Sequence, residues 1–328
     1  MEIGALVALT LPGIESFLVG ECKALGVPLG RVGDGWVEVA SGDAAQQVRG
    51  AGTLRALIDL IWRGPAESPP DRLPPAQRLW FEAQWINRGR ETAEVRAAVV
   101  RAAGGPVEAD LDGPPDLVAI LDRGGVLHIG RARVWGCERR RPYRVALMAR
   151  ALNPALARAM VMASRAREGD LLCDPCCGSG TVLAERAMLG PCRLVGVDVD
   201  AGALDAASRT LSGWVAQGRV VARLCHGDAR NLPLEPGEAT AVATNLPFGH
   251  RMGTAADNAA LYPALLREAA RILRPRSRLV VLTSDRRHLR GGLRACGAAL
   301  RPRSEVRVWL GGLEPTLGVY DRTDEPLA

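Results

Sequence analysis

Short apolar runs alternate with longer segments of helical periodicity in the second half of the chain. The apolar runs have the length of buried strands, and polar or turn-forming residues follow each one. They lie at 171–173, 193–198, 219–225, 239–245 and 279–283, and the expected helices lie at 181–189, 201–211, 261–273 and 286–296. This alternation predicts a mainly parallel, doubly wound α/β sheet, with residues 305–320 as a terminal hairpin.

The first half of the chain follows an α+β pattern instead. Expected strands lie at 3–9, 36–40 and 54–62, with helices opening near Leu11 and Ser41, as in a small ferredoxin-like unit. A second set comprises a strand at 79–85, a helix at 92–103 that Thr92 caps, and short strands at 107–111, 117–121 and 126–130.

Two segments divide the chain into domains. Residues 64–75 hold five prolines, which neither a helix interior nor a central strand accommodates. Residues 131–144 are the most basic stretch of the chain, and Pro142 breaks it. We therefore expect a ferredoxin-like domain at 1–66, a second small domain at 67–134, a basic linker at 135–151 and the α/β domain at 152–328.

The composition is that of a water-soluble protein with a positive charge. Of the 328 residues, 48% are hydrophobic and 24% charged, and no apolar run approaches the roughly 20 residues that span a bilayer. The N-terminus lacks the basic start of a signal peptide, so we expect a cytoplasmic location. The net charge of +6 comes almost entirely from arginine, because Lys23 is the single lysine. Arginine grips phosphate groups, so this charge permits a nucleic-acid partner without requiring one.

Eight cysteines in such a chain are expected to be free thiols. Cys173, Cys176 and Cys177 lie close together and raise the possibility of a metal site. No second C-x-x-C or H-x-x-x-H pair completes a tetrahedral set, so loop packing is the favoured interpretation and we expect no metal.

The segment Asp-Pro-Cys-Cys-Gly-Ser-Gly-Thr at 174–181 joins the first strand of the α/β domain to its helix. Its glycines allow a ligand to approach the backbone closely. A phosphate-binding P-loop is excluded because Thr181, and no lysine, follows the last glycine. A dinucleotide fingerprint is only partly matched, because Leu183 stands where the third glycine belongs, which disfavours a nicotinamide oxidoreductase.

Polar side chains mark the ends of four expected strands, at Asp174, Asp198, Asp228 and Asn245. In an open parallel sheet, ligands bind at the carboxyl ends of the strands. Each of these residues alone can be a helix cap or a turn residue. All four in order are better explained by one polar ligand that meets them together.

This pattern is similar to that of the S-adenosylmethionine-dependent class I methyltransferases, whose first motif the segment 174–181 resembles. The resemblance implies that the turn and Asp174 hold the methionyl part of S-adenosylmethionine, Asp198 its ribose and Asp228 its adenine amino group. The cofactor-binding residues expected on this basis are Asp174, Cys176, Gly178, Ser179, Gly180, Thr181, Asp198, Asp228, Ala229 and Asn245.

Residues 245–249, Asn-Leu-Pro-Phe-Gly, resemble the [N/D]-P-P-[Y/F] motif of methyltransferases that act on exocyclic amines. Such an amine is a poor nucleophile, and hydrogen bonds to the Asn245 side chain and the Leu246 carbonyl would localise its lone pair. Pro247 stiffens the loop and Phe248 offers a stacking face, so Asn245, Leu246, Pro247 and Phe248 are the expected catalytic residues. Leu246 replaces the commoner proline, and a plain β-turn is the alternative.

Residues 80–84, the following helix and residues 107–120 resemble the THUMP domain, which occurs with a ferredoxin-like unit in several tRNA-modifying enzymes. The alternative is a generic α+β accessory domain at 67–134. Arginines beside aromatic rings suit an RNA backbone, so Arg139, Arg140, Arg141, Arg144 and Arg251 are candidate RNA contacts. A solvated linker explains the basic stretch equally well, and the basic helix 286–294 is interpreted as a solvated surface.

Together these resemblances identify the chain as similar to the family that forms N2-methylguanosine in tRNA, including the acceptor-stem enzymes. The expected reaction moves a methyl group from S-adenosylmethionine to the guanine N2 amine. Methylation of rRNA guanine N2 or of nucleic-acid adenine N6 remains open, as does a non-catalytic RNA-binding protein.

Overall fold

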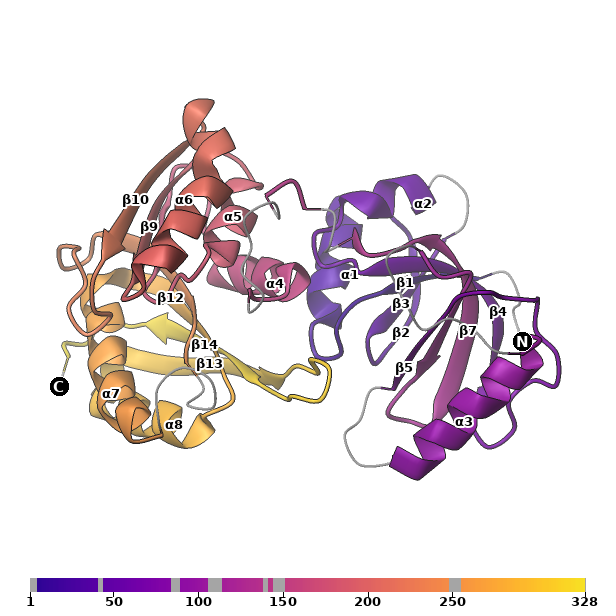
Figure 1. The fold of residues 1–328 in the computed structure, drawn as a ribbon. Coiled ribbons are helices and arrows are strands. Elements are labelled where there is room, and N and C mark those ends of the chain that lie inside the picture. Colours follow the sequence, from indigo (N-terminus) through magenta and orange to yellow (C-terminus); the bar gives the residue numbers. More distant parts are fainter. Residues whose placement is uncertain are drawn as a thin grey trace. The chain divides into compact units, whose positions relative to one another are not determined.

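The computed structural model describes residues 5–40, 44–83, 89–105, 114–137, 141–143, 151–247 and 255–327. The chain forms two compact units (Figure 1). Unit 1 comprises Met1–Arg140 and Val308–Leu313, and unit 2 comprises Arg141–Arg307 and Glu314–Ala328. None of the described helices combines the length and the apolar character that crossing a lipid bilayer requires.

Unit 2 is built on a seven-stranded sheet of order β10-β9-β8-β11-β12-β14-β13. The first five strands in this order run parallel, and β14 and β13 add an antiparallel edge. The strands are β8 (Leu171–Asp174), β9 (Cys192–Asp198), β10 (Val220–His226), β11 (Ala239–Asn245), β12 (Leu273–Thr283), β13 (Leu300–Arg307) and β14 (Thr316–Arg322). The sheet is therefore the doubly wound α/β type that the alternating pattern predicts.

Helices cover both faces of this sheet (Figure 1). Helices α4, α5 and α6 pack on one another and on one face, while α7 and α8 pack together on the other. The helices are α4 (Pro154–Ser164), α5 (Thr181–Ala187), α6 (Ala201–Ala216), α7 (Ala255–Ile272) and α8 (Arg286–Ala295). Asn153 caps α4 through its side chain, and Pro154 occupies the first turn, where a missing N–H costs nothing.

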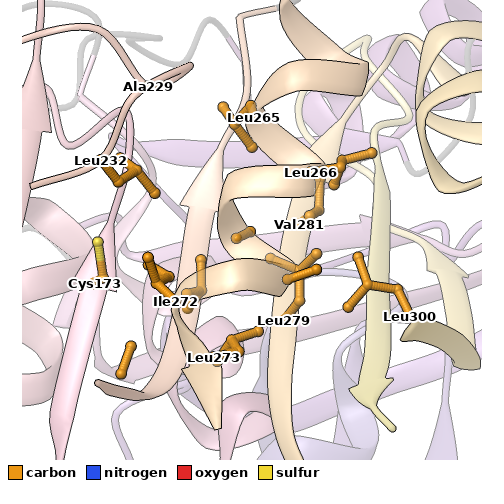
Figure 2. Packing of buried hydrophobic residues seen from close by; sticks show 14 of the residues in the cluster. Cys173, Ala229, Leu232, Leu265, Leu266, Ile272, Leu273, Leu279, Val281 and Leu300 are labelled. Carbon is orange, nitrogen blue, oxygen red and sulfur yellow. The ribbon is translucent and has the colours of Figure 1, made fainter. Parts of the chain in front are cut away.

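One buried apolar cluster of unit 2 lies between the sheet and α7 (Figure 2). Alternate residues of neighbouring strands face it, among them Cys173 of β8 and both Leu279 and Val281 of β12. Leu265 and Leu266 of α7 meet them, and all five side chains are fully buried. Burial of each such side chain contributes roughly 1.5–3 kcal/mol, and this packing holds the strand ends in place.

Unit 1 contains a second seven-stranded sheet, of order β2-β3-β1-β4-β7-β6-β5. Among the strands that the structure describes in unit 1, only β5 and β6 pair in parallel. Its elements are β1 (Leu6–Leu9), α1 (Glu15–Ala24), β2 (Leu29–Gly33), β3 (Trp36–Val39), α2 (Ala44–Gln47), η1 (Val48–Gly50), β4 (Ala56–Pro65), β5 (Leu79–Ala83), α3 (Gly89–Ala102), β6 (Leu117–Leu121) and β7 (Val126–Val134). Strands from both sides of the proline-rich segment join this one sheet.

The start of one helix in unit 1 differs from the sequence-based expectation. Helix α3 begins by Gly89, so Thr92 lies inside the helix and does not cap it. The prediction was wrong because Glu91 in the first turn already favours a start before Thr92. The expected strand at 107–111 lies outside the described residues.

A buried ion cluster ties the start of unit 2 to α5. The Glu185 side chain is fully buried, and its carboxylate contacts Arg158 Nε at 3.0 Å and Arg141 Nε at 2.8 Å. The Tyr143 hydroxyl donates a third bond to it. Burial raises the pKa of Glu185, and the two guanidinium groups oppose that effect.

We predict that Glu185→Ala destabilises the protein by about 3–5 kcal/mol, because it removes the buried carboxylate that pairs with two largely buried arginines. Urea unfolding of unit 2 measures this loss. Glu168→Ala removes an exposed glutamate of the same unit and is expected to change the unfolding free energy by less than about 0.5 kcal/mol. Equal effects of both substitutions would contradict a structural role for the cluster.

Candidate functional site at the carboxyl edge of the parallel sheet

The four polar residues that follow the parallel strands lie along one edge of the unit 2 sheet. Strand β8 ends at Asp174, β9 at Asp198 and β11 at Asn245, and Asp228 follows two residues after β10. The register aligns their ends, because Asp174 pairs with Gly196, and Asp198 pairs with His226. The strand order therefore places the residues in the spatial sequence Asp228, Asp198, Asp174, Asn245.

This edge includes the point at which the strand order reverses. From β8 the chain proceeds to β9 and β10 on one side, and then returns to add β11 on the other side of β8. Loops from adjacent strands leave in opposite directions at such a point and open a crevice between them. Asp174 and Asn245 stand on the two strands that border it.

The glycine turn after β8 is held close to β9. Gly178 N donates to Asp198 Oδ2 at 2.8 Å, and Cys177 N donates to the Val197 carbonyl at 3.0 Å. Gly178 has φ +52°, and a β-carbon there would meet no atom within 4 Å, so the turn leaves open space beside its backbone. Gly180 has φ +80°, and a β-carbon built on it would lie 3.2 Å from the Ala207 β-carbon, so the glycine lets the start of α5 pack closely against α6.

Asp174 is a buried carboxyl group with only 2% of its surface exposed. Its Oδ1 accepts a hydrogen bond from Cys176 N at 3.2 Å. Burial raises the pKa of Asp174 to about 7, and the neighbouring charge of Asp198 adds to that shift. A positively charged ligand beside it would favour the ionised form.

The other two carboxylates have different surroundings. Asp198 is 8% exposed, and its Oδ1 also accepts from Asp200 N at 3.0 Å. The Asp228 side chain is 40% exposed and paired with Arg230, whose hydrogen bonds lower the pKa of Asp228. Four further residues expected at the cofactor complete this edge, of which Cys176 is half-buried and Ser179, Thr181 and Ala229 are buried.

Three cysteines lie at the end of β8 and in the turn, of which Cys173 and Cys177 are buried and Cys176 is half-buried. Burial raises the pKa of Cys173, Cys176 and Cys177 far above that of a free thiol, so all three stay protonated. Across the described ranges, no group of three metal-ligating side chains comes together.

The loop after β11 carries a polar atom without a partner. Asn245 Oδ1 is buried, and no described residue bonds to it. Leu246 N donates to the Leu282 carbonyl at 3.0 Å, which anchors the loop to the end of β12. A buried acceptor without a donor costs roughly 1–3 kcal/mol, so a ligand that supplies the donor gains that amount. Phe248 lies outside the described residues.

Tyr262 of α7 holds the same loop from the other side. Its hydroxyl donates to the Pro247 carbonyl at 2.8 Å and lies 2.7 Å from Thr283 Oγ1. Both Tyr262 and Thr283 are fully buried. Sequence reasoning missed Tyr262, although it is one of only three tyrosines in the chain and stands in a largely aliphatic helix.

The basic stretch before unit 2 is only partly described. Arg141 and Tyr143 both bond to Glu185 inside the unit, so Arg141 has an internal partner in place of the expected RNA contact. Trp135 packs on Trp80 in unit 1, with ring centroids 5.1 Å apart. The other candidate RNA contacts, Arg139, Arg140, Arg144 and Arg251, lie outside the described residues.

Residues 141–315 match the family model UPF0020, described as an RMKL-like methyltransferase domain. A bovine (Bos taurus) protein named tRNA (guanine(6)-N(2))-methyltransferase THUMP3 is 32% identical over 185 residues, which are 53% of this chain and 37% of that protein. The tRNA (guanine(6)-N2)-methyltransferase of Thermus thermophilus is 34% identical over 231 residues, covering 70% of this chain and 66% of that protein. The chain thus spans little more than a third of its bovine relative.

Solved structures share the fold across both units. The crystal structure of TrmN from Thermus thermophilus superposes with a TM-score of 0.70 and 27% sequence identity, over 97% of this chain and 99% of that one. A possible methylase from Clostridium difficile 630 has a TM-score of 0.71 at 17% identity, over 99% of this chain and all of that chain. The second match concerns the fold alone.

We predict that Asp174 makes the protein less stable as the pH rises from about 4 to about 7. In that range the unfolded chain loses the Asp174 proton while the native state retains it, so the native state is disfavoured. The loss reaches about 4 kcal/mol for a pKa shift of this size. Urea unfolding at pH 5 and pH 8 should show a smaller pH dependence for Asp174→Asn than for wild type. Asp205→Asn, at an exposed position of α6, should leave that dependence unchanged.

Proposed function

The chain belongs to the UPF0020 family of RMKL-like methyltransferase domains, and we propose that it methylates the N2 amine of a guanosine in tRNA with S-adenosylmethionine. The observation that carries this proposal is Asn245 Oδ1, a buried acceptor without a partner among the described residues, on a strand that neighbours the glycine turn. An amine donor fits that atom. The names of the bovine and Thermus relatives support guanine N2 as the amine and tRNA as the substrate.

The residues at the sheet edge fit S-adenosylmethionine, which supplies a methyl group on a positively charged sulfur. The open backbone at Gly178 leaves room for the ligand, and the buried Asp174 carboxyl group gains stability beside a cation. Asp198 keeps unused lone pairs on both oxygens, so it can accept from ribose hydroxyls while it holds Gly178 N. Asp228 and Ala229 stand further along the edge, where the adenine would lie.

The amine would be bound by two acceptors of one loop. Asn245 Oδ1 and the Leu246 carbonyl accept its two N–H bonds, which localises the nitrogen lone pair and stabilises the positive charge that develops on it. The bonds from Leu246 N and to the Pro247 carbonyl hold these acceptors in position before the substrate arrives. Positioning of this kind supplies much of the rate, so the reaction needs no strong general base. The guanine must leave its helix to reach the loop.

Selection of tRNA would fall to unit 1, as the resemblance of its second half to THUMP domains implies. An acceptor-stem guanosine is the proposed target. Arg139, Arg140, Arg144 and Arg251 remain candidate contacts to the RNA backbone, whereas Arg141 is committed to Glu185.

We predict that Asn245→Ala lowers the rate of methyl transfer by about 10²–10³-fold, because it removes one acceptor for the developing charge. The affinity for S-adenosylmethionine, measured by calorimetry, should stay nearly unchanged. Labelled methyl transfer to tRNA from a strain that lacks the protein, followed by nucleoside mass spectrometry, identifies the product. Formation of N6-methyladenosine, or normal turnover by Asn245→Ala, would refute the proposal.

Tyr262→Phe should lower the maximal rate by about 10- to 100-fold, because the Pro247 carbonyl loses its anchor and the two acceptors shift. S-adenosylmethionine affinity should not change. Tyr320→Phe is the matched control, since it removes another buried hydroxyl of the same core, bonded to Glu305 and not to the loop. Equal losses of rate in both variants would indicate general destabilisation instead of loop positioning.

A further inference from the structure

Helix α8 presents a row of arginines to solvent. Its sequence, Arg-Arg-His-Leu-Arg-Gly-Gly-Leu-Arg-Ala, contains no acidic residue. Arg287, Arg290 and Arg294 are exposed and are spaced three and four residues apart, so they lie on one face of the helix. We call these three residues the arginine face. It spans about 10 Å along the helix axis.

Stability does not account for the arginine face. Within the described ranges, its three side chains form no ion pair with a carboxylate. Asp285 is the nearest acidic residue along the chain, and both of its carboxylate oxygens already form hydrogen bonds with His288 and Asn258. Arg287 lies in the first turn, where the helix dipole disfavours a positive charge, and like charges three or four residues apart repel. An anionic partner from outside the protein would compensate for both effects.

Gly291 leaves bare backbone in the middle of the arginine face. It lies four residues after Arg287 and three before Arg294, and a β-carbon built on it meets no atom within 4 Å. At the neighbouring position 292, packing inside the protein explains why the residue is glycine. A β-carbon on Gly292 would come within 2.6 Å of Leu266 Cδ1 on α7. No such contact explains Gly291, and a glycine inside a helix is destabilising. Its absent side chain lets a partner approach the helix closely between the arginines.

The arginine face begins beside the proposed amine-binding loop. Leu246 N bonds to the end of β12, and Tyr262 joins the Pro247 carbonyl to Thr283. Thr283 Oγ1 in turn accepts from the backbone N–H of Asp285, the residue that caps α8. Consecutive hydrogen bonds therefore connect the loop to the first turn of α8.

We propose that Arg287, Arg290 and Arg294 bind the phosphate backbone of the RNA strand next to the flipped nucleotide, with the strand passing over Gly291. This inference rests on the proposed function, which brings a nucleotide to the adjoining loop. Guanidinium groups bind phosphate oxygens in pairs of hydrogen bonds, and three along one face match an extended anion better than a small one.

The test compares two full-length variants that each lose two positive charges. Arg287→Gln/Arg294→Gln removes both ends of the arginine face. Arg209→Gln/Arg219→Gln removes two exposed arginines at α6 and just before β10, away from the carboxyl edge of the sheet. Binding of an unmodified tRNA transcript is measured by fluorescence anisotropy between roughly 50 and 200 mM salt, where phosphate contacts dominate the affinity.

The arginine-face variant should lower the slope of log affinity against log salt by about 1.4–1.8, because each lost phosphate contact removes about 0.7–0.9. Its KM for tRNA should rise about tenfold or more at low salt, while kcat at saturating tRNA and the affinity for S-adenosylmethionine stay unchanged. The control variant should keep the wild-type slope. The proposal would be overturned if the salt slope fell equally in both variants, or if it fell in neither variant.

Gly291→Gln tests the close approach of the strand. Its side chain would stand between the arginines, so tRNA binding should weaken several-fold while the thermal midpoint stays the same or rises. Wild-type affinity in this variant would show that no strand passes over Gly291. The test of the RNA surface can be separated from the test of the catalytic proposal. If the wild-type protein forms no N2-methylguanosine but the arginine-face variant still has a lower salt slope than the wild type and the control, only the catalytic proposal is refuted.

Discussion

The pairing of β8 with β9 on one side and with β11 on the other is the constraint on which the site depends. Parallel strands end at the same edge of a sheet, so the strand ends at Asp174, Asp198 and Asn245 become neighbours although they are far apart in sequence. Asp174 and Asn245 are brought to adjoining strands because the chain returns across β8 after building β10. The helices on both faces bury these strands, and the apolar packing stabilises an edge that carries polar groups in unfavourable surroundings.

Those polar groups are held by the protein before any ligand arrives. The Asp174 carboxyl group is buried with a raised pKa, and Asn245 Oδ1 has no partner among the described residues. Tyr262 and the end of β12 anchor the loop that presents Asn245, and the same bonds lead to the cap of α8. The proposed amine site and the proposed RNA surface thus share one buried support, so a change at Thr283 would affect both.

Local patterns predicted the elements that carry a strong signal in their own sequence. The expected strand at 239–245 coincides with β11, and the expected start of α8 at Arg286 is confirmed, because an apolar run and a cap residue carry those signals locally. The edge strand β2 (Leu29–Gly33) was missed, since its residues are mostly exposed and need no apolar alternation. The insertion of β14 between β12 and β13 was also not predictable, because pairing of distant strands leaves no pattern in either one.

The amino-acid sequence by itself determined which chemical groups are available: carboxylates and an amide at strand ends, glycines in one turn and arginines in place of lysines. Local periodicity and turn-forming residues are enough to place these groups at strand ends and in a turn, because both signals extend over only a few residues. Only the tertiary structure decided the surroundings of each group. It buried Asp174, left Asp228 half in solvent, committed Arg141 to Glu185 and placed Tyr262 against the loop. Burial and partnership depend on residues distant in sequence, which is why these distinctions required the fold.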